Sequence, residues 1–397
     1  MLRLVNRLLR IIGLELRRPA AGAMPSRVVS LRPDGEPAGN VLISYIPDDV
    51  LKAEAEVSAS HTHYWECRHM AHSFRDAGYN VDVIDFADSE FVPDKSYEVL
   101  VSARTNLERL AKHVPAHCLK IAHLDTAHFL TNNANATERL RQVRDKHRVA
   151  LRSTRMVEAN WALEAADMGC VLGNAFTADT YEFAGKPIYR IPLSSVRRFD
   201  WQADKDFDAC RKTFLWFGSG GFVHKGLDLV IDAFAELPDY RLLICGPLDL
   251  EPRFVRAFDD ALYHRDNIET IGWTNVTSPE FAEIRRRAIA MVYPSCSEGG
   301  GGSTITCMHA GLIPVVSAQA SVDVGDFGTV IDDLSVDAVR DAVQALGEQP
   351  VTTLEQRARA AWEFARQHHT RETFAANYDQ FVANVVLPEV RRRRASA

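Results

Sequence analysis

The sequence has no paired cysteines, no long hydrophobic run and no excess of positive charge, and each absence excludes a class of protein. Its seven cysteines are scattered singly without a Cys-x-x-Cys pair, which argues against a disulfide framework and for reduced thiols in the cytoplasm. No stretch of about 20 apolar residues is present, so we expect no membrane-spanning helix. The net charge of −7 at pH 7 argues against nucleic acid as a partner. A charged fraction of 25% is instead typical of a globular enzyme.

The two ends of the chain are basic, unlike the rest. In residues 1–18, MLRLVNRLLRIIGLELRR, five arginines stand against one glutamate, and Arg3, Arg7 and Arg10 share one helical face. Because Arg7 and Arg10 interrupt the apolar run, we expect an amphipathic helix lying on an anionic membrane surface rather than a signal peptide. A solvated helix that packs on the body is the alternative. The RRRR at 391–394 either adds attraction to lipid or forms a disordered basic tail. We therefore expect a cytoplasmic protein, peripheral on the inner face of the membrane.

Strands and helices alternate along most of the chain, bounded by turn residues. Two such series, at 40–195 and 205–350, are joined by the polar stretch 194–212, and helices follow at 353–390. Alternation of this kind predicts a parallel sheet with helices on both faces. We therefore expect an α/β protein with two doubly wound Rossmann-like domains, a cleft between them, and a helical C-terminal tail that crosses back to the N-terminal domain. Ligands of such sheets lie at the carboxyl ends of the strands, which places the expected site in the cleft.

A run of four glycines, at 299–302, lies between a strand end and a helix in VYPSCSEGGGGSTITCMHAG. Glycine lets the backbone approach a ligand, and a helix start favours an anion, so this turn predicts a phosphate site. Ser303 and Thr304 are expected to cap the helix and to donate to phosphate oxygens. The turn matches neither the Walker pattern nor the dinucleotide-binding Gly-x-Gly-x-x-Gly pattern. A tight turn without a ligand is the structural alternative.

The segment PSCSEGGGGSTITCMHAGLIPVVS resembles the donor-site motif of the family 4 retaining glycosyltransferases, which have the GT-B fold. Upstream, FVHKGLDLVIDAF is similar to the helix start that places a lysine of this family, here Lys225, at the donor diphosphate. With NIETIGWTNVTSPEFAEIRRRAIAMVYPS between them, the matches span about residues 213–317, whereas the amino-terminal half matches only in outline. The residues in register with the glycine-rich motif are Glu298, Gly299, Gly301, Met308, Gly311, Pro314, Val315 and Val316.

Two positions depart from the family pattern. Thr306 stands where the family usually has a second glutamate that binds the nucleotide ribose, and Gly220 stands near an expected arginine. The threonine hydroxyl is a neutral and shorter replacement, which weakens the ribose contact by about 1 kcal/mol. Backbone N–H groups of Gly218, Gly220 and Gly221 are expected to take the place of the arginine.

The resemblance implies transfer of a sugar from a nucleotide-diphosphate sugar, with retention and without a metal or other cofactor. Positive charge then develops on the sugar and negative charge on the leaving diphosphate, which Lys225 and the amides of 300–303 are expected to stabilise. Glu298 is expected to bind hydroxyls of the donor sugar, its alternative being a carboxylate bonded to the helix start. The complete expected donor site is Gly218, Gly220, Gly221, Lys225, Glu298, Gly300, Gly301, Gly302, Ser303, Thr304 and Thr306.

The amino-terminal half is expected to supply the acceptor side. KIAHLDTAHFL places His123, Asp125 and His128 at a strand end. The resemblance implies a histidine there that contacts the donor sugar, and we favour His123, so that the expected catalytic residues are His123, Glu298 and Lys225. A packed or capping histidine is the alternative for both histidines.

A second acceptor-side candidate is the helix start HTHYWECRHM. His63, Tyr64 and Trp65 are expected to face the cleft, stacking on sugar or packing under the loop. Although His61, His63, Cys67 and His69 are metal-ligand types, no second ligand pair completes a tetrahedral set, so we expect no metal. Arg68 and Arg104 are alternative phosphate partners, although such residues more often form surface salt bridges.

The sequence thus predicts a glycosyltransferase that acts on a glycan or lipid-linked acceptor in the synthesis of a cell-surface polysaccharide or glycolipid. Two alternatives stay open at this point. One is a nucleotide-sugar epimerase of the same fold, against which the basic amphipathic start counts. The other is a non-catalytic glycan-binding GT-B protein, which the substitutions at Thr306 and Gly220 allow.

Overall fold

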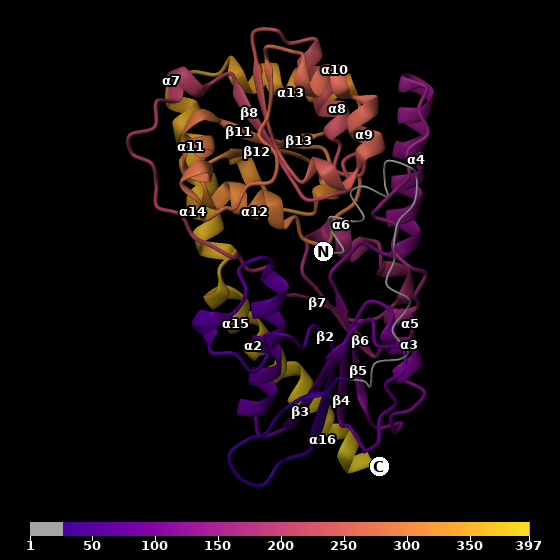
Figure 1. Ribbon diagram of the computed structural model, residues 1–397. Coiled ribbons are helices and arrows are strands. Elements are labelled where there is room, and N and C mark those ends of the chain that lie inside the picture. The colour runs from indigo at the N-terminus through magenta and orange to yellow at the C-terminus, as the bar shows by residue number, and fades with distance from the viewer. Residues whose placement is uncertain (1–26, 397) are drawn as a thin grey trace, which may run out of the picture.

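The computed structural model describes residues 27–396, which form two α/β halves stacked one above the other (Figure 1). These residues form one sheet of seven strands and one of six. The predicted fold class, with two doubly wound sheets and a helical tail, is confirmed. The amphipathic helix expected at 1–18 lies outside the described residues.

The sheet of the amino-terminal half has the order β1-β3-β2-β4-β5-β6-β7. All neighbouring strands are parallel except β1 and β3, which pair antiparallel. The edge strand β1 was not predicted, since its three residues are too few to show an alternating pattern. The strands are β1 (Val29–Leu31), β2 (Asn40–Tyr45), β3 (Asn80–Asp85), β4 (Val99–Ala103), β5 (Leu119–Leu124), β6 (Met168–Val171) and β7 (Ile188–Arg190).

Helices of this half follow the apolar spacing of the sequence. In α2, Trp65, Met70 and Phe74 are buried as their spacing predicts, and the helix ends just before Gly78, whose φ of +91° continues no helix. The helix α4 has 19 residues and is long enough to reach the other half. The helices are α2 (Thr62–Asp76), α3 (Asn106–Leu110), α4 (Phe129–His147), α5 (Ala162–Ala165) and α6 (Ala175–Asp179).

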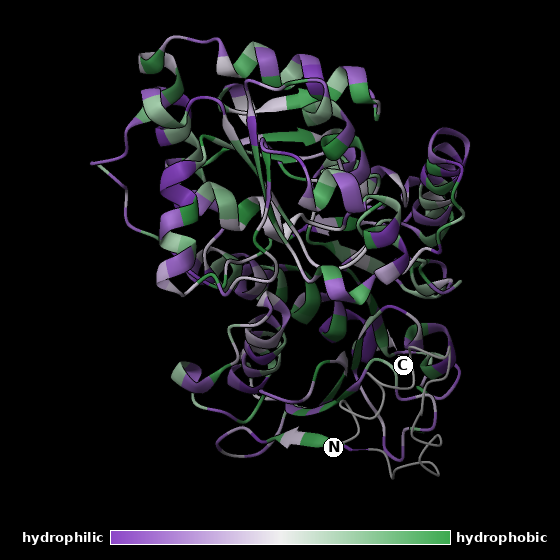
Figure 2. Ribbon diagram, turned by 45° about the horizontal axis from the view of Figure 1, so that its top comes forward, coloured by the Kyte–Doolittle hydropathy of each residue, from purple (hydrophilic) through white to green (hydrophobic). Residues whose placement is uncertain are grey.

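The sheet of the carboxy-terminal half is wholly parallel, with the order β10-β9-β8-β11-β12-β13. This is the Rossmann order, whose direction reverses between β8 and β11. Figure 2 shows its strands as mostly hydrophobic ribbons between two-toned helices, as expected for a sheet covered on both faces. The strands are β8 (Thr213–Phe217), β9 (Arg241–Cys245), β10 (Ile268–Thr270), β11 (Ala290–Tyr293), β12 (Ile313–Ser317) and β13 (Thr329–Ile331).

Two short helices of this half follow each other almost directly. The stretch 253–264 forms α9 and α10, which are separated at Phe258. The helices are α7 (Phe207–Cys210), α8 (Leu227–Ala235), α9 (Pro252–Ala257), α10 (Asp259–Tyr263), α11 (Pro279–Arg287), α12 (Gly302–His309) and α13 (Val336–Gly347).

Three helices end the chain: α14 (Val351–His368), α15 (Arg371–Phe381) and α16 (Leu387–Ser396). They run from the upper half down along the lower one, with α14 against α12 and α15 against α2 (Figure 1). The RRRR stretch is part of α16, so of its two alternatives the disordered basic tail is wrong. Arg393 pairs with Asp167 at 3.1 Å and Arg394 with Glu98 at 3.0 Å, which ties the helix to the amino-terminal sheet. None of the helices within residues 27–396 is long and apolar enough to cross a membrane.

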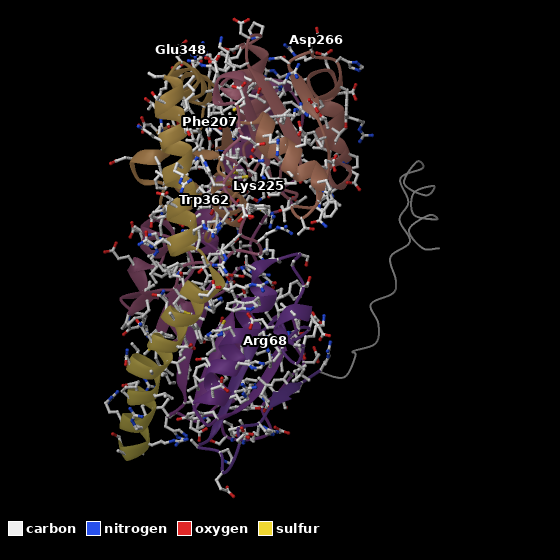
Figure 3. The ribbon with its side chains drawn as sticks, turned by 90° about the vertical axis from the view of Figure 1, so that its left-hand side faces the viewer. Arg68, Phe207, Lys225, Asp266, Glu348 and Trp362 are labelled. Carbon is white, nitrogen blue, oxygen red and sulfur yellow. The ribbon has the colours of Figure 1, made fainter. Side chains whose placement is uncertain are left out.

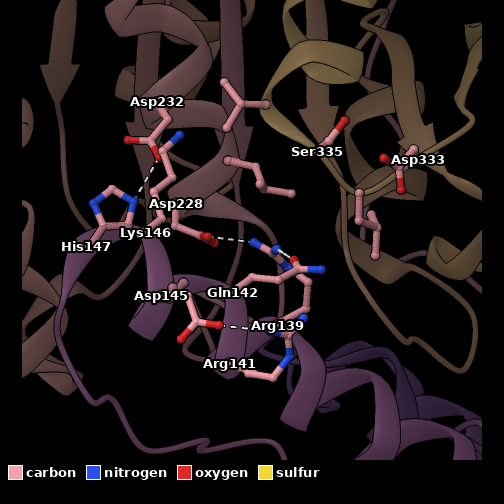
Figure 4. A pocket seen from close by; sticks show the side chains of 14 residues that line it. Arg139, Arg141, Gln142, Asp145, Lys146, His147, Asp228, Asp232, Asp333 and Ser335 are labelled. Carbon is pink, nitrogen blue, oxygen red and sulfur yellow. Dashed lines mark hydrogen bonds and ion pairs between the residues drawn. The ribbon is translucent and has the colours of Figure 1, made fainter.

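The long helix α4 carries the amino-terminal half across to α8 (Figure 1). Arg139 and Asp228 form a buried ion pair at 2.5 Å, and His147 Nε2 lies 2.9 Å from a carboxylate oxygen of Asp232. A cavity of about 390 Å³ lies at this contact, lined by α4, α8 and the loop before α13 (Figure 4). Its walls carry charges of both signs that pair with one another. The contact therefore joins the halves, and the chemistry of the sequence motifs lies elsewhere.

Three of the buried histidines, His123, His309 and His369, predict sensitivity to acid. Burial lowers the pKa of His123, His309 and His369 to about 4, from an ordinary value of 6.5. The unfolded chain therefore takes up these protons at a higher pH than the folded protein, and the stability that the neutral rings contribute is lost as pH falls from 6.5 to 4. Glu66 acts in the opposite sense, because burial raises its pKa to about 7 and its contribution is lost as pH rises from 4.5 to 7.

We expect the free energy of unfolding to fall by about 3 kcal/mol between about pH 7.5 and about pH 5, measured by urea denaturation. His369→Asn keeps a donor for the Leu193 carbonyl, which His369 Nδ1 contacts at 3.0 Å, and removes one titrating ring. It should therefore show a smaller fall. The exposed His264→Asn serves as the matched control and should behave as the wild type. A free energy of unfolding that does not change between the two pH values would contradict the assignment of neutral buried rings.

Candidate active site

The strand order of the carboxy-terminal half reverses between β8 and β11. Sheets of this kind bind ligands in a crevice beyond the carboxyl ends of such strands, which makes this place the expected donor crevice. The loop after β8 holds Gly218 and Gly221, and the loop after β11 holds Glu298 and the glycine run 299–302. Lys225 ends the first of these loops, just before α8. The fold thus brings together the two segments that resemble the donor site.

Glu298 lies at the centre of a hydrogen-bonded cluster in this crevice. Its Oε1 accepts hydrogen bonds from Lys225 Nζ at 3.1 Å and from Tyr293 OH at 2.8 Å. Ser295 Oγ donates to the same oxygen at 3.0 Å, and Lys225 Nζ donates to Tyr293 OH at 2.5 Å. No hydrogen bond within residues 27–396 reaches Oε2, so this oxygen is available to a ligand. Figure 3 places Lys225 where the two halves face each other.

This cluster holds one positive charge, on Lys225, beside one negative charge, on Glu298. Lys225 is only 4% exposed, and burial lowers its pKa while the charge of Glu298 partly offsets that effect. Burial alone would raise the pKa of Glu298, but the charge of Lys225, with smaller contributions from His224 and Arg155, lowers it to about 2. Glu298 is therefore an anion at neutral pH.

The four glycines differ in what the fold demands of them. Gly301 has a φ of +59°, and a Cβ on Gly299 would overlap the backbone of Asp125 in the other half, so both positions need glycine for the fold itself. A Cβ on Gly300 or Gly302 would meet its nearest neighbour at an ordinary 3.5 Å. Packing therefore does not require glycine at these two positions, and the space beside their backbone is open to a ligand.

The start of α12 differs in one respect from the prediction. Its N-cap is Gly301, and no side chain caps it, so the expectation that Ser303 or Thr304 caps the helix is wrong. The left-handed glycine lets the chain enter the helix one residue earlier, and Thr304 is then fully buried inside the first turn. The amides of the first turn still lack acceptors within the helix, and together with the helix dipole they favour an anion.

The groups expected to replace the two missing family contacts are already bonded. Thr306 Oγ1 donates to the carbonyl of Gly302 at 2.8 Å, which leaves its lone pairs to accept from a ribose hydroxyl. The N–H of Gly218 donates to the carbonyl at the end of β9 at 3.0 Å, and the N–H of Gly221 donates to the Glu251 carboxylate. These two amides therefore do not provide the free donors expected in place of the arginine.

Opposite the donor crevice, buried polar side chains gather at the carboxyl ends of β2, β4 and β5. His123 is 1% exposed, its ring centroid lies 4.9 Å from that of Tyr45, and neither His123 Nε2 nor Tyr45 OH has a partner among the described residues. Asp125 pairs with Arg104 at 2.8 Å and lies 3.8 Å from His63 Nδ1. A Cβ on Gly299 would overlap the backbone of Asp125, so the glycine-rich turn lies directly against the strand end that carries this cluster.

Glu66 belongs to the same cluster, although the sequence did not identify it. Its Oε1 accepts from Ser194 N and Oγ at 2.8 and 2.7 Å, whereas its Oε2 has no hydrogen-bond partner in the described part of the chain and lies 4.0 Å from His63 Nε2. The signal in the sequence was its spacing, because Glu66 lies four and eight residues before the buried Met70 and Phe74. A carboxylate on the apolar face of a helix indicates a functional or bonded group.

Trp65 does not face the cleft, contrary to the prediction. Its indole stacks on His69 at 5.3 Å and packs against Phe374 of α15, and its Nε1 donates to Glu54 at 2.9 Å. The C-terminal helices cover this side of α2, which the sequence pattern alone could not indicate. Arg68 lies well below Lys225 in the amino-terminal half (Figure 3), and its Nε donates to the carbonyl of Lys52 at 2.8 Å. Tyr64 is half-buried against the core.

His128 is a capping residue rather than an acceptor-side ligand, so that prediction is wrong as well. It is the N-cap of α4, and its Nδ1 accepts from the N–H of Leu130 at 3.4 Å. Its ring packs against those of Tyr181 and Phe183 at 5.3 and 4.9 Å. The signal that separates it from His123 is its place just before a long helix, where a side-chain acceptor is needed.

His61, at the start of α2, caps the helix. Its Nδ1 accepts from the N–H of His63. In the part of the chain that the structure describes, no group of three or more His, Cys, Asp or Glu side chains is arranged to hold a metal ion.

Comparison with known proteins agrees with this geometry. Residues 211–349 match the family described as glycosyl transferases group 1, whereas no curated protein matches the chain in sequence. A sucrose-phosphate synthase from Thermosynechococcus elongatus is similar in structure, with a TM-score of 0.62 and 14% identity over 88% of this chain and 100% of that chain.

Two further solved structures are similar over nearly their whole length. Anabaena Alr3699/HepE, in complex with UDP and glucose, has a TM-score of 0.54 and 13% identity, covering 88% of this chain and 100% of that one. WaaG, a glycosyltransferase involved in lipopolysaccharide biosynthesis, has a TM-score of 0.52 and 14% identity, covering 86% and 98%. The chain is therefore a glycosyltransferase with the GT-B fold, and its residues 211–349 are similar to the group 1 glycosyl transferases.

Proposed function

We propose that this glycosyltransferase moves a sugar from a nucleotide-diphosphate sugar to a glycan or lipid-linked acceptor, with retention at the anomeric carbon. The product belongs to a cell-surface polysaccharide or glycolipid that is made at the inner face of the membrane, where basic residues 1–18 hold the enzyme peripherally. The observation that carries the proposal is the pair of Lys225 and Glu298, held at 3.1 Å beside a glycine-rich helix start.

Each charge of this pair has a separate role in the proposed reaction. Breaking the anomeric C–O bond leaves negative charge on the diphosphate, which Lys225 and the first amides of α12 stabilise without reorganising. Glu298 Oε1 is held by three donors, and its free Oε2 accepts hydrogen bonds from hydroxyls of the donor sugar. His123 Nε2 contacts the same sugar from the other half. Solved relatives support this choice of substrate, since Alr3699/HepE was crystallised with UDP and glucose.

The proposal is tested by thermal unfolding of the protein with a panel of nucleoside diphosphates and their sugars. A ligand at 100 times its dissociation constant stabilises the folded state by about 2.7 kcal/mol, so one base should stand out by a clear rise in Tm. Each matching nucleoside and inorganic phosphate serve as controls and should give smaller shifts. A panel in which no diphosphate or sugar raises Tm would refute the proposed donor.

A further inference from the structure

A side chain of the amino-terminal half reaches the turn where the family arginine is missing. Arg155 lies in the loop between α4 and α5, and its Nε donates to the carbonyl of Gly220 at 3.0 Å. Its Nη2 donates to Ser219 Oγ at 2.6 Å. The guanidinium thus rests directly on the position that departs from the family pattern, although it comes from the opposite half of the molecule.

The turn is shaped to admit this arginine. Gly221 has a φ of +94°, and a Cβ there would overlap the side chain of Arg155, so a larger residue would displace it. The neighbouring Thr154 Oγ1 donates to Glu251 at 3.1 Å, and Glu251 in turn accepts the N–H of Gly221. Two adjacent residues of the loop are therefore fixed on the same turn.

The guanidinium also stands close to the charges of the donor crevice. The amide of Lys225 donates to the carbonyl of Gly221 at 2.8 Å, so Arg155 and Lys225 flank one tight turn. Arg155 is among the charges that act on both Lys225 and Glu298. Glu251 is the opposing carboxylate of this turn, and its Oε1 is already bonded to two backbone amides and Thr154.

Arg155 has donors to spare for a ligand. A guanidinium carries five N–H donors, of which the two described bonds use only those on Nε and Nη2. The side chain is exposed, so a ligand can reach the remaining donors. Its planar fork matches the oxygens of a diphosphate, which a lysine contacts only as a point charge.

We propose that Arg155 replaces the missing arginine and binds the diphosphate of the nucleotide sugar, opposite Lys225. This inference rests on the proposed function, because it assigns a further residue to the same donor site. The donor diphosphate then bridges the two halves, and donor binding stabilises their closed arrangement.

The experiment compares the affinities of UDP and UMP, or of the matching pair if the panel selects another base, for the wild type and for Arg155→Ala. Since the lost contact is to the diphosphate, we expect UDP binding to weaken about tenfold or more, with UMP binding much less affected. Adding Gly220→Arg to Arg155→Ala should restore UDP affinity. An arginine fits at 220, where a Cβ would find its nearest neighbours at 3.6 Å without a positive φ.

Arg152→Ala is the matched control, because Arg152 is an exposed arginine of the same loop. It should bind both nucleotides as the wild type does. Unchanged UDP affinity in Arg155→Ala, or equal losses for UDP and UMP, would overturn the role of Arg155 while leaving the donor site intact. Failure of the wild type to bind any nucleoside diphosphate would instead overturn the proposed function.

Discussion

Replacing Lys225 with alanine is expected to lower kcat/KM for sugar transfer by at least about 10³-fold, a loss of roughly 4 kcal/mol of transition-state stabilisation. The reason is the position of the ammonium group, which is buried and fixed by Tyr293 OH at 2.5 Å and Glu298 Oε1 at 3.1 Å. Because the ammonium group is already in position, no free energy is spent on moving it when the diphosphate departs. Steady-state kinetics with the selected nucleotide sugar measure the effect, and UDP affinity should fall with it.

A second buried lysine of the same half provides the control. Lys205 Nζ donates to the carbonyls of Arg285 and Ala288 at 3.0 and 2.6 Å, and burial lowers its pKa to about 8. These carbonyls precede β11, whereas the glycine-rich turn follows the opposite end of that strand. Lys205→Met should reduce stability by about 1–3 kcal/mol through the unpaired carbonyls and leave kcat/KM nearly unchanged. Lys225→Ala with full activity would exclude this lysine from the reaction.

Loss of folding must be separated from loss of chemistry in the lysine variant. Without Lys225, the Glu298 carboxylate is left in the crevice with no cation beside it, which costs stability by as much as about 3 kcal/mol. The double variant Lys225→Met with Glu298→Gln removes both charges and should unfold at a higher temperature than Lys225→Ala. The double variant should nevertheless remain inactive, because its higher stability does not replace the missing charge of Lys225.

The donor turn could be predicted from the sequence because its parts are local. A strand end, a glycine run and a helix start within about a dozen residues determine where the amides point, whatever the rest of the chain does. Lys225 and Glu298 lie 73 positions apart, yet each follows a parallel strand beside the point where the order reverses, so the fold brings them together. The helix α13 was open to the same reasoning, since Ser335 caps it before the buried Val339 and Val343.

The sequence could not indicate which face of a given helix is covered by distant parts of the chain. Trp65 and His63 both lie in the first turn of α2. The helix α15 covers Trp65, whereas His63 lies on another side of α2, next to Asp125. Arg155 belongs to no recognisable motif. It reaches Ser219 and Gly220 only because α4 places the two halves next to each other. The role of the Tyr293 hydroxyl could not be predicted either, because Tyr293 belongs to an apolar strand. Only the path of the loop after β11 brings Glu298 to within 2.8 Å of this hydroxyl.

Replacing Glu298 with glutamine is expected to separate sugar binding from nucleotide binding. Glutamine keeps the size of the side chain but removes the anion, so hydroxyls of the donor sugar lose a charged acceptor at Oε2. We expect kcat/KM for transfer to fall at least about 100-fold, or about 2.7 kcal/mol, and affinity for the intact nucleotide sugar to weaken. Affinity for UDP alone should change little, whereas Lys225→Ala weakens both. Calorimetric titration of the two variants with each ligand measures this difference.

The pH dependence of stability gives the glutamate variant an independent readout. Because the folded pKa of Glu298 is lowered to about 2, its ionised form contributes stability that is present above its ordinary value of 4.5 and is lost as pH falls toward 2. Glu298→Gln removes this contribution and leaves Lys225 buried without its anion, so the variant should unfold more easily at neutral pH and lose less on acidification. The control is Glu269→Gln, which breaks the pair with Arg287 outside the crevice and should keep transfer. If Glu298→Gln binds the nucleotide sugar as tightly as the wild type, the carboxylate is a helix-start anchor, and another group must hold the sugar.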